Sequence, residues 1–152
     1  MNIESIASGL QQMRTDAHPN CVVCSSSNER SLRLEFEGLG NGEVQALFEC
    51  NEVFEGYAGV IHGGVVASLV DAAMTNCLFA HGVSAVTAEL NVRFRQPVVT
   101  GKVAMVRAWI ERSTTRLYVV QAEIVQDRQS KAIAFGKFMK KAPFSRQIES
   151  WP

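Results

Sequence analysis

Apolar residues recur with the period of a helix in two segments of the chain. Near the N-terminus, four of them follow this spacing within residues 1–14 and predict a short amphipathic helix: Ile3, Ile6, Leu10 and Met13. The second segment, from Gly64 to about Ala80, is apolar on nearly every side, and Gly82 follows it at a position that suits a helix C-cap. Because this helix has so little polar surface, we expect other parts of the chain to cover it.

The remaining regular segments have the apolar content and spacing of strands. We predict two strands before the long helix and four after it, at residues 32–37, 43–50, 84–95, 102–112, 115–127 and 131–140. The glycine-bounded turn between the first two predicts a hairpin. The last four are long and joined by short connections, which predicts an antiparallel meander. One apolar helix against a curved antiparallel sheet is an α+β domain.

Composition is that of an ordinary globular protein. The chain has 152 residues, of which 47% are hydrophobic and 20% charged, and this length is enough for one domain with a buried core. Fifteen basic residues balance fifteen acidic ones, so the basic excess of a nucleic-acid-binding protein is missing. We expect one domain over residues 1–152, with an N-terminal helix and loop (1–30), a core (31–140) and a tail (141–152), and no nucleic-acid partner.

The sequence also shows neither the long apolar run of a membrane-spanning helix nor the N-terminal pattern of a signal peptide. No stretch reaches about 18 uninterrupted apolar residues, and the first ten residues lack the basic start and apolar run of a signal peptide. These features predict a cytoplasmic protein without a membrane partner. In that reducing compartment we expect four free thiols: Cys21, Cys24, Cys50 and Cys77.

Cys21 and Cys24 form a Cys-x-x-Cys pair, which His18 precedes by three residues. A structural zinc ion usually takes four protein ligands, and His18 would supply only a third. We therefore predict two ordinary thiols in a loop, with no metal site and no other cofactor.

A His-Gly-Gly turn opens the long helix and carries the strongest chemical signal. Gly63 and Gly64 let the backbone approach a ligand closely. Their N–H groups lie at the positive end of the helix dipole, where an anion or a developing oxyanion can bind. Asp71 is a charge within an otherwise apolar helix, and buried carboxylates of this kind are often functional.

The spacing of these groups restricts how they can act together. Gly63 and Asp71 are eight residues apart, about 12 Å along a helix and on roughly the same face. One carbonyl cannot touch both, because each group must approach it to about 3 Å. If both act on one substrate, they should come from two chains that meet at a two-fold axis.

This part of the chain resembles the PaaI-type hotdog thioesterases, a family named after phenylacetate degradation. The resemblance rests on HGGVVASLVDAAM at residues 62–74 and on AVTAELNVRFRQP at residues 85–97. CVVC at residues 21–24, followed by LRL at 32–34, resembles the N-terminal segment of one subgroup. The resemblance covers about residues 18–140. It implies a hotdog fold, in which a curved antiparallel sheet wraps one long central helix, and a site at the interface of a homodimer that often forms a homotetramer.

Carried over to this sequence, the resemblance implies hydrolysis of an acyl-CoA thioester to a free acid and CoA. The Gly63 N–H would polarise the thioester carbonyl, and Asp71 of the neighbouring chain would activate water or attack directly. His62 would shape the turn or bond to the substrate, and Thr87 would help to position the water. Some relatives carry an asparagine where this chain has Gly56, so the network that holds the water differs here.

Two kinds of substrate contact follow from this interpretation. Beside Gly64, apolar side chains predict a pocket for an apolar or aromatic acyl group: Val60, Ile61, Met74, Leu78 and Phe79. On the strand after the helix, Arg93 and Arg95 share a face with other polar residues. One of these arginines, with Lys102, would bind the CoA phosphates; otherwise they form a solvated face.

Each candidate also has a purely structural interpretation. His62 could bond to a backbone carbonyl, the glycines could permit close packing, Asp71 could be a paired buried carboxylate, and Thr87 could pack in its strand. Two other functions stay open: a non-catalytic acyl-CoA binder or regulator, and a hydratase or dehydratase. The second typically pairs a histidine with a carboxylate in motifs that do not read His-Gly-Gly with Asp nine residues after the histidine. We predict the hydrolase.

Overall fold

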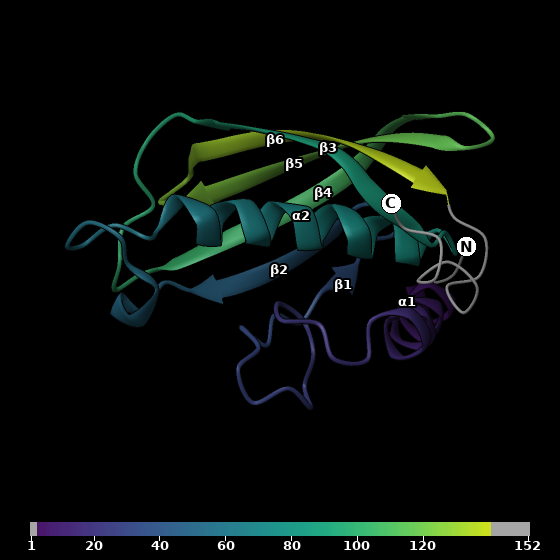
Figure 1. The fold of residues 1–152 in the computed structure, drawn as a ribbon, viewed down its shortest axis with the longest axis horizontal. Coiled ribbons are helices and arrows are strands. Elements are labelled where there is room, and N and C mark those ends of the chain that lie inside the picture. The colour runs from purple at the N-terminus through teal and green to yellow at the C-terminus, as the bar shows by residue number, and fades with distance from the viewer. Residues whose placement is uncertain (1–2, 141–152) are drawn as a thin grey trace, which may run out of the picture.

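One long helix, α2 (Gly63–Ala80), lies across a six-stranded antiparallel sheet in the computed structural model, which describes residues 3–140 (Figure 1). The other elements, in chain order, are α1 (Ile3–Ala17), β1 (Glu37–Gly38), β2 (Val44–Glu49), the short 3-10 helix η1 (Glu52–Phe54), β3 (Ala85–Phe94), β4 (Val103–Ser113), β5 (Leu117–Gln126) and β6 (Gln129–Lys140). This arrangement confirms the predicted α+β class, with a central helix preceded by a shorter N-terminal one. The predicted tail at 141–152 lies outside the described residues.

The sheet has the strand order β1-β2-β4-β5-β6-β3, and each neighbouring pair is antiparallel. Strands β4, β5 and β6 form the predicted meander. The prediction is wrong for β3, which pairs with β6 at the far edge and not with β4. The connection between β3 and β4 is bonded instead to the segment before α2, since the Ile61 N–H donates to the Val98 carbonyl at 2.8 Å.

The predicted strand at residues 32–37 is wrong in all but its last residue. The side chains alternate between buried and exposed as expected, but the backbone bonds elsewhere. The N–H groups of Leu32 and Leu34 donate to the carbonyls of Val22 and Val23 at 2.9 Å. Arg33 between them has a φ of 54°, which interrupts an extended strand. The run therefore anchors the N-terminal loop, and only Glu37–Gly38 pairs with β2.

The core forms where α2 meets the sheet. Most of this helix is buried, which confirms that other parts of the chain cover it: Val66, Leu69, Val70, Ala72, Ala73, Met74, Thr75, Asn76, Cys77, Leu78 and Phe79. Its length and hydropathy would also allow a membrane span, but its apolar faces pack on the sheet. Gly82, with a φ of 70°, ends the helix as predicted, and its N–H donates to the Phe79 carbonyl at 2.9 Å.

The N-terminal helix α1 packs against α2 and β1 (Figure 1). Ile6 and Leu10 are its buried side chains. The loop after α1 stays close to the C-terminal half of α2, where the His18 ring meets Phe79 edge-on with ring centroids 5.1 Å apart. The N-terminal segment therefore covers a part of α2 that the sheet leaves open.

Gly136 tests how tightly the sheet packs on α2. A Cβ at this position of β6 would lie 2.6 Å from Met74 Sδ and 2.6 Å from Phe138 Cε2, and both side chains are fully buried. We expect Gly136→Ala to lower the free energy of unfolding by about 1–3 kcal/mol in urea titrations. Gly9→Ala in α1 is the control, because nothing lies within 4 Å of its Cβ, and it should not destabilise. Equal stability of the two variants would contradict the close packing.

Candidate active site

The first turn of α2 has one backbone donor left over. Three of its four N–H groups are used within the turn. The Gly64 N–H donates to Nδ1 of His62 at 2.8 Å, and the N–H groups of Val65 and Val66 donate to the His62 carbonyl at 2.9 and 3.1 Å. The remaining group, the N–H of Gly63, has no partner among the hydrogen bonds of residues 3–140. An N–H in this position can bind an anion or a developing oxyanion.

His62 is the N-cap of α2, and the two glycines after it have different roles. A Cβ at Gly64 would lie 3.1 Å from His62 Nδ1, so glycine at that position lets the imidazole fold back onto the helix start. A Cβ at Gly63 would meet only the Phe94 ring, at an ordinary 3.5 Å. Since Nδ1 of His62 accepts a hydrogen bond, the proton of the neutral ring is on Nε2.

A groove of about 600 Å³ lies beside this turn. It is mostly apolar and is lined by Gly56, Tyr57, Val60, Ile61, His62, Gly63, Val66, Phe94, Arg95, Gln96, Pro97 and Val98. A Cβ at Gly56 would lie 3.1 Å from His62 Cδ2, so the glycine leaves that face of the imidazole uncovered. The groove thus joins an apolar surface to the unpartnered N–H of Gly63.

Asp71 and Thr87 form a second polar group further along α2. Thr87 Oγ1 donates to Asp71 Oδ1 at 2.7 Å, while Oδ2 has no hydrogen-bond partner among the described residues. Burial raises the pKa of Asp71, and the bond from Thr87 together with the charge of His18 partly opposes this rise. Asp71 is therefore a carboxylate held in one orientation, with one oxygen free to accept a proton.

A β-bulge turns Thr87 toward Asp71. The pairing of β3 with β6 slips between Thr87 and Glu89, so that Thr87 lies opposite the buried Phe138 and Glu89 lies opposite Lys137. Glu89 and Lys137 form an ion pair at 2.7 Å on the outer face. Without the bulge, strict alternation would place Thr87 on that same outer face. Sequence periodicity carries no sign of this slip.

The two polar groups stay apart within one chain. Both belong to the continuous helix Gly63–Ala80, so the eight residues from Gly63 to Asp71 correspond to about 12 Å. The groove is lined by Gly63 but by neither Asp71 nor Thr87. One chain therefore does not bring the free N–H and the carboxylate to a common point.

The predicted substrate contacts divide into two sets. Val60, Ile61 and Arg95 line the groove. Arg93 is exposed on β3 outside the groove lining, and Lys102 is paired with Asp127.

Met74, Leu78 and Phe79 lie elsewhere. All three are buried in the hydrophobic core, and none lines the groove. The N–H of Gly64, also a predicted contact, is already bonded to His62. The helical pattern identified these residues as apolar or near the turn, but it could not say which face of α2 meets the groove.

The comparison with known proteins assigns a family. Residues 58–133 match the model of the thioesterase superfamily. The chain belongs to this superfamily.

The chain is similar to acyl-coenzyme A thioesterase THEM4 of Bos taurus, with 27% identity over 120 residues that cover 76% of this chain and 49% of the bovine protein. The mouse THEM4 (Mus musculus) is 29% identical over 79 residues, 52% of this chain and 34% of that protein. The chain thus spans half or less of the length of these relatives.

Solved structures confirm the fold. PaaI from the E. coli phenylacetic acid degradation operon has a TM-score of 0.75 at 18% identity, with coverage of 91% of this chain and 97% of PaaI. The thioesterase superfamily protein RHA08564 has a TM-score of 0.74 at 24% identity, with coverage of 78% and 59%. The predicted hotdog architecture and the resemblance to PaaI-type proteins are confirmed.

The capping role of His62 predicts different effects for two substitutions. His62→Ala removes the acceptor for the Gly64 N–H and should lower the free energy of unfolding by about 0.5–2 kcal/mol. His62→Asn keeps a side-chain acceptor at the N-cap and should retain most of that stability. Urea unfolding followed by far-UV circular dichroism measures both. If the asparagine variant is as unstable as the alanine variant, the contribution of His62 is not the cap.

Proposed function

We propose that this protein hydrolyses acyl-CoA thioesters to a free acid and CoA, at a site shared by two copies of the chain. The unpartnered N–H of Gly63, at the positive end of α2 and beside an apolar groove, carries this proposal. Membership of the thioesterase superfamily and the name of the bovine relative support the substrate class.

The chemistry divides between the two polar groups. The thioester carbonyl oxygen accepts a hydrogen bond from the Gly63 N–H, and the helix dipole adds to the stabilisation of the negative charge that develops there. Asp71 takes a proton from water as the water oxygen attacks the carbonyl carbon. The tetrahedral intermediate then collapses, the carbon–sulfur bond breaks, and Asp71 returns the proton to the departing CoA sulfur. Thr87 keeps Asp71 in position. The raised pKa of Asp71 makes this carboxylate a stronger base than that of an exposed aspartate.

The edge strand β3 indicates how two copies would meet. Among residues 3–140 it pairs only with β6, on one side, and it is ten residues long. Such an open edge is a template for pairing with another chain. A two-fold axis normal to the sheet would make two β3 strands antiparallel neighbours, with the Phe94 end of one beside the Thr87 end of the other. Gly63 lies next to Phe94 and Asp71 next to Thr87. Pairing would therefore bring the N–H of one copy toward the carboxylate of the other.

Asp71→Asn tests the base. It keeps the shape of the side chain and its bond to Thr87 but removes the proton acceptor, so we expect kcat to fall by about 10²-fold or more. Release of free thiol from short, medium, long and aromatic acyl-CoAs measures this and identifies the acyl class. Asp127→Asn is the matched control, because its carboxylate pairs with Lys102 at the surface. Binding of acyl-CoA without thiol release by the wild type would indicate a binding protein and contradict hydrolysis.

Gly63→Pro removes the candidate oxyanion donor with little disturbance of the helix. Gly63 is the first residue of α2, where proline is favoured, and His62 has φ −57° and ψ 134°, a conformation that proline tolerates in the residue before it. We expect this variant to fold and to lose about 10²–10³-fold in kcat. Gly63→Ala is the control: it keeps the N–H and adds a Cβ at an ordinary contact distance from Phe94. Equal activity of the two variants would exclude the N–H from catalysis.

The same variant tests whether two chains share the site. A mixed dimer of Gly63→Pro and Asp71→Asn chains contains one site with both defects and one with neither. Refolding an equal mixture should therefore restore about a quarter of wild-type activity, since half of the dimers are mixed and each has one intact site. If each site lies within one chain, the mixture stays as inactive as its parents.

A further inference from the structure

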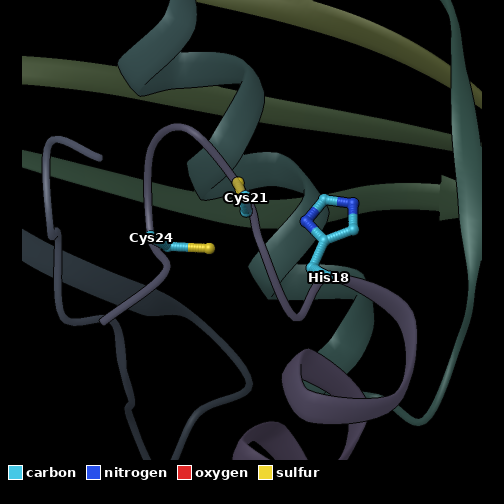
Figure 2. A group of neighbouring side chains, drawn as sticks. All are labelled: His18, Cys21 and Cys24. Carbon is cyan, nitrogen blue, oxygen red and sulfur yellow. The ribbon is translucent and has the colours of Figure 1, made fainter. Parts of the chain in front are cut away.

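The loop after α1 brings three side chains together outside the proposed active site. His18, Cys21 and Cys24 each offer one ligand atom, and these atoms all lie within 4.8 Å of one another. Figure 2 shows the Cys24 thiol and a ring nitrogen of His18 turned toward the space beside Cys21. The three residues follow a His-x-x-Cys-x-x-Cys spacing, and all four cysteines of the chain are free.

His18 is the unexpected member of this group, because one nitrogen of its half-buried ring lacks a hydrogen-bond partner. Nδ1 of His18 is inaccessible to solvent and has no hydrogen-bond partner within the part of the chain that the structure describes. The ring is fixed edge-on against Phe79, with centroids 5.1 Å apart. Leaving a buried polar atom unpaired is unfavourable, so Nδ1 in this position would be stabilised by a partner. An ion among the three ligands would be that partner.

Each of the two sulfur atoms accepts a hydrogen bond from a nearby N–H group. The Val23 N–H donates to Cys21 Sγ at 3.4 Å, and the Asn76 amide donates to Cys24 Sγ at 3.8 Å. The Arg14 guanidinium donates to the Cys24 carbonyl, so a positive charge lies beside the cluster. Donors of this kind commonly surround the ligands of a metal site and fix their orientation.

We propose that His18, Cys21 and Cys24 bind one Zn²⁺ ion, or a similar divalent transition-metal ion, through the imidazole nitrogen and two thiolates. In a tetrahedral zinc site the bond lengths place neighbouring ligand atoms about 3.5–3.8 Å apart. The ligand atoms of the present cluster lie within 4.8 Å of one another, so closing it to that size requires them to approach by up to about 1.3 Å. The two thiolates neutralise the charge of the ion, and binding releases the thiol protons. No other histidine, cysteine or carboxylate among residues 3–140 joins the cluster, so water completes the coordination.

Such an ion would act as a clamp on the N-terminal segment. The ligands come from one short loop, but that loop is held on α2 through Phe79 and Asn76. Fixing the loop therefore fixes α1 against the C-terminal half of α2. Because the folded chain holds the three ligand atoms close together, the ion would bind it more tightly than the unfolded chain and should raise the melting temperature.

Metal binding to the full-length reduced chain tests this site without any assay of activity. We expect one Zn²⁺ per chain after dialysis, measured by elemental analysis, and a Co²⁺ derivative with the absorption of a tetrahedral thiolate site. Zn²⁺ should also raise the melting temperature and protect two thiols from alkylation. Cys21→Ser and His18→Ala should each weaken binding by at least about 10-fold, the size of effect known for altered metal sites. Cys50→Ala, which removes a buried cysteine outside the cluster, should bind normally.

Three results would overturn the proposal. The first is a reduced wild-type chain that takes up no Zn²⁺ and gives no thiolate–Co²⁺ absorption, whether or not the variants fold. The second is unchanged binding in Cys21→Ser. The third is protection of the two thiols only after oxidation, which would assign the pair to a disulfide. None of these results would contradict thioester hydrolysis, which is tested separately by thiol release.

Discussion

A single rigid helix constrains this molecule more than any other feature. α2 carries the free N–H of Gly63 at its first position and the carboxylate of Asp71 eight residues later, so their separation is set by the helical rise at about 12 Å. Because α2 is packed against the sheet, it cannot bend to bring the two groups closer together. Gly63 and Asp71 lie beside opposite ends of the edge strand β3. Antiparallel pairing of two β3 strands would therefore bring Gly63 of one copy near Asp71 of the other.

Features that depend on neighbouring residues could be predicted from the sequence. The long helix, its glycine C-cap, the turn at its start and five of the six strands follow from local periodicity and turn chemistry. Gly63, Gly64 and Asp71 were candidates for the same reason, because a helix start and a charge in an apolar helix are visible in a short window. Even so, the sequence did not reveal that His62 uses the Gly64 N–H and thereby leaves the Gly63 N–H as the free donor.

Features that depend on distant partners could not be predicted. The run at 32–37 alternates like a strand, but its hydrogen bonds go to Val22 and Val23. β3 follows α2 yet pairs with the last strand of the sheet, a choice that no local pattern encodes. Thr87 reaches Asp71 only because a bulge changes the phase of its strand. In the same way, apolar character alone could not separate Val60 in the groove from Met74 in the core.

The cysteine pair shows why counting ligands in a sequence is a weak guide to a metal site. Three ligands fall short of the usual four, and on that count the sequence predicts free thiols. Folding adds what the count omits: a histidine nitrogen buried without a partner, and amide donors aimed at both sulfur atoms. His18 and Cys21 also act electrostatically on Asp71. An ion held there would therefore change the charge felt by the proposed base, and this links the N-terminal loop to the chemistry at α2.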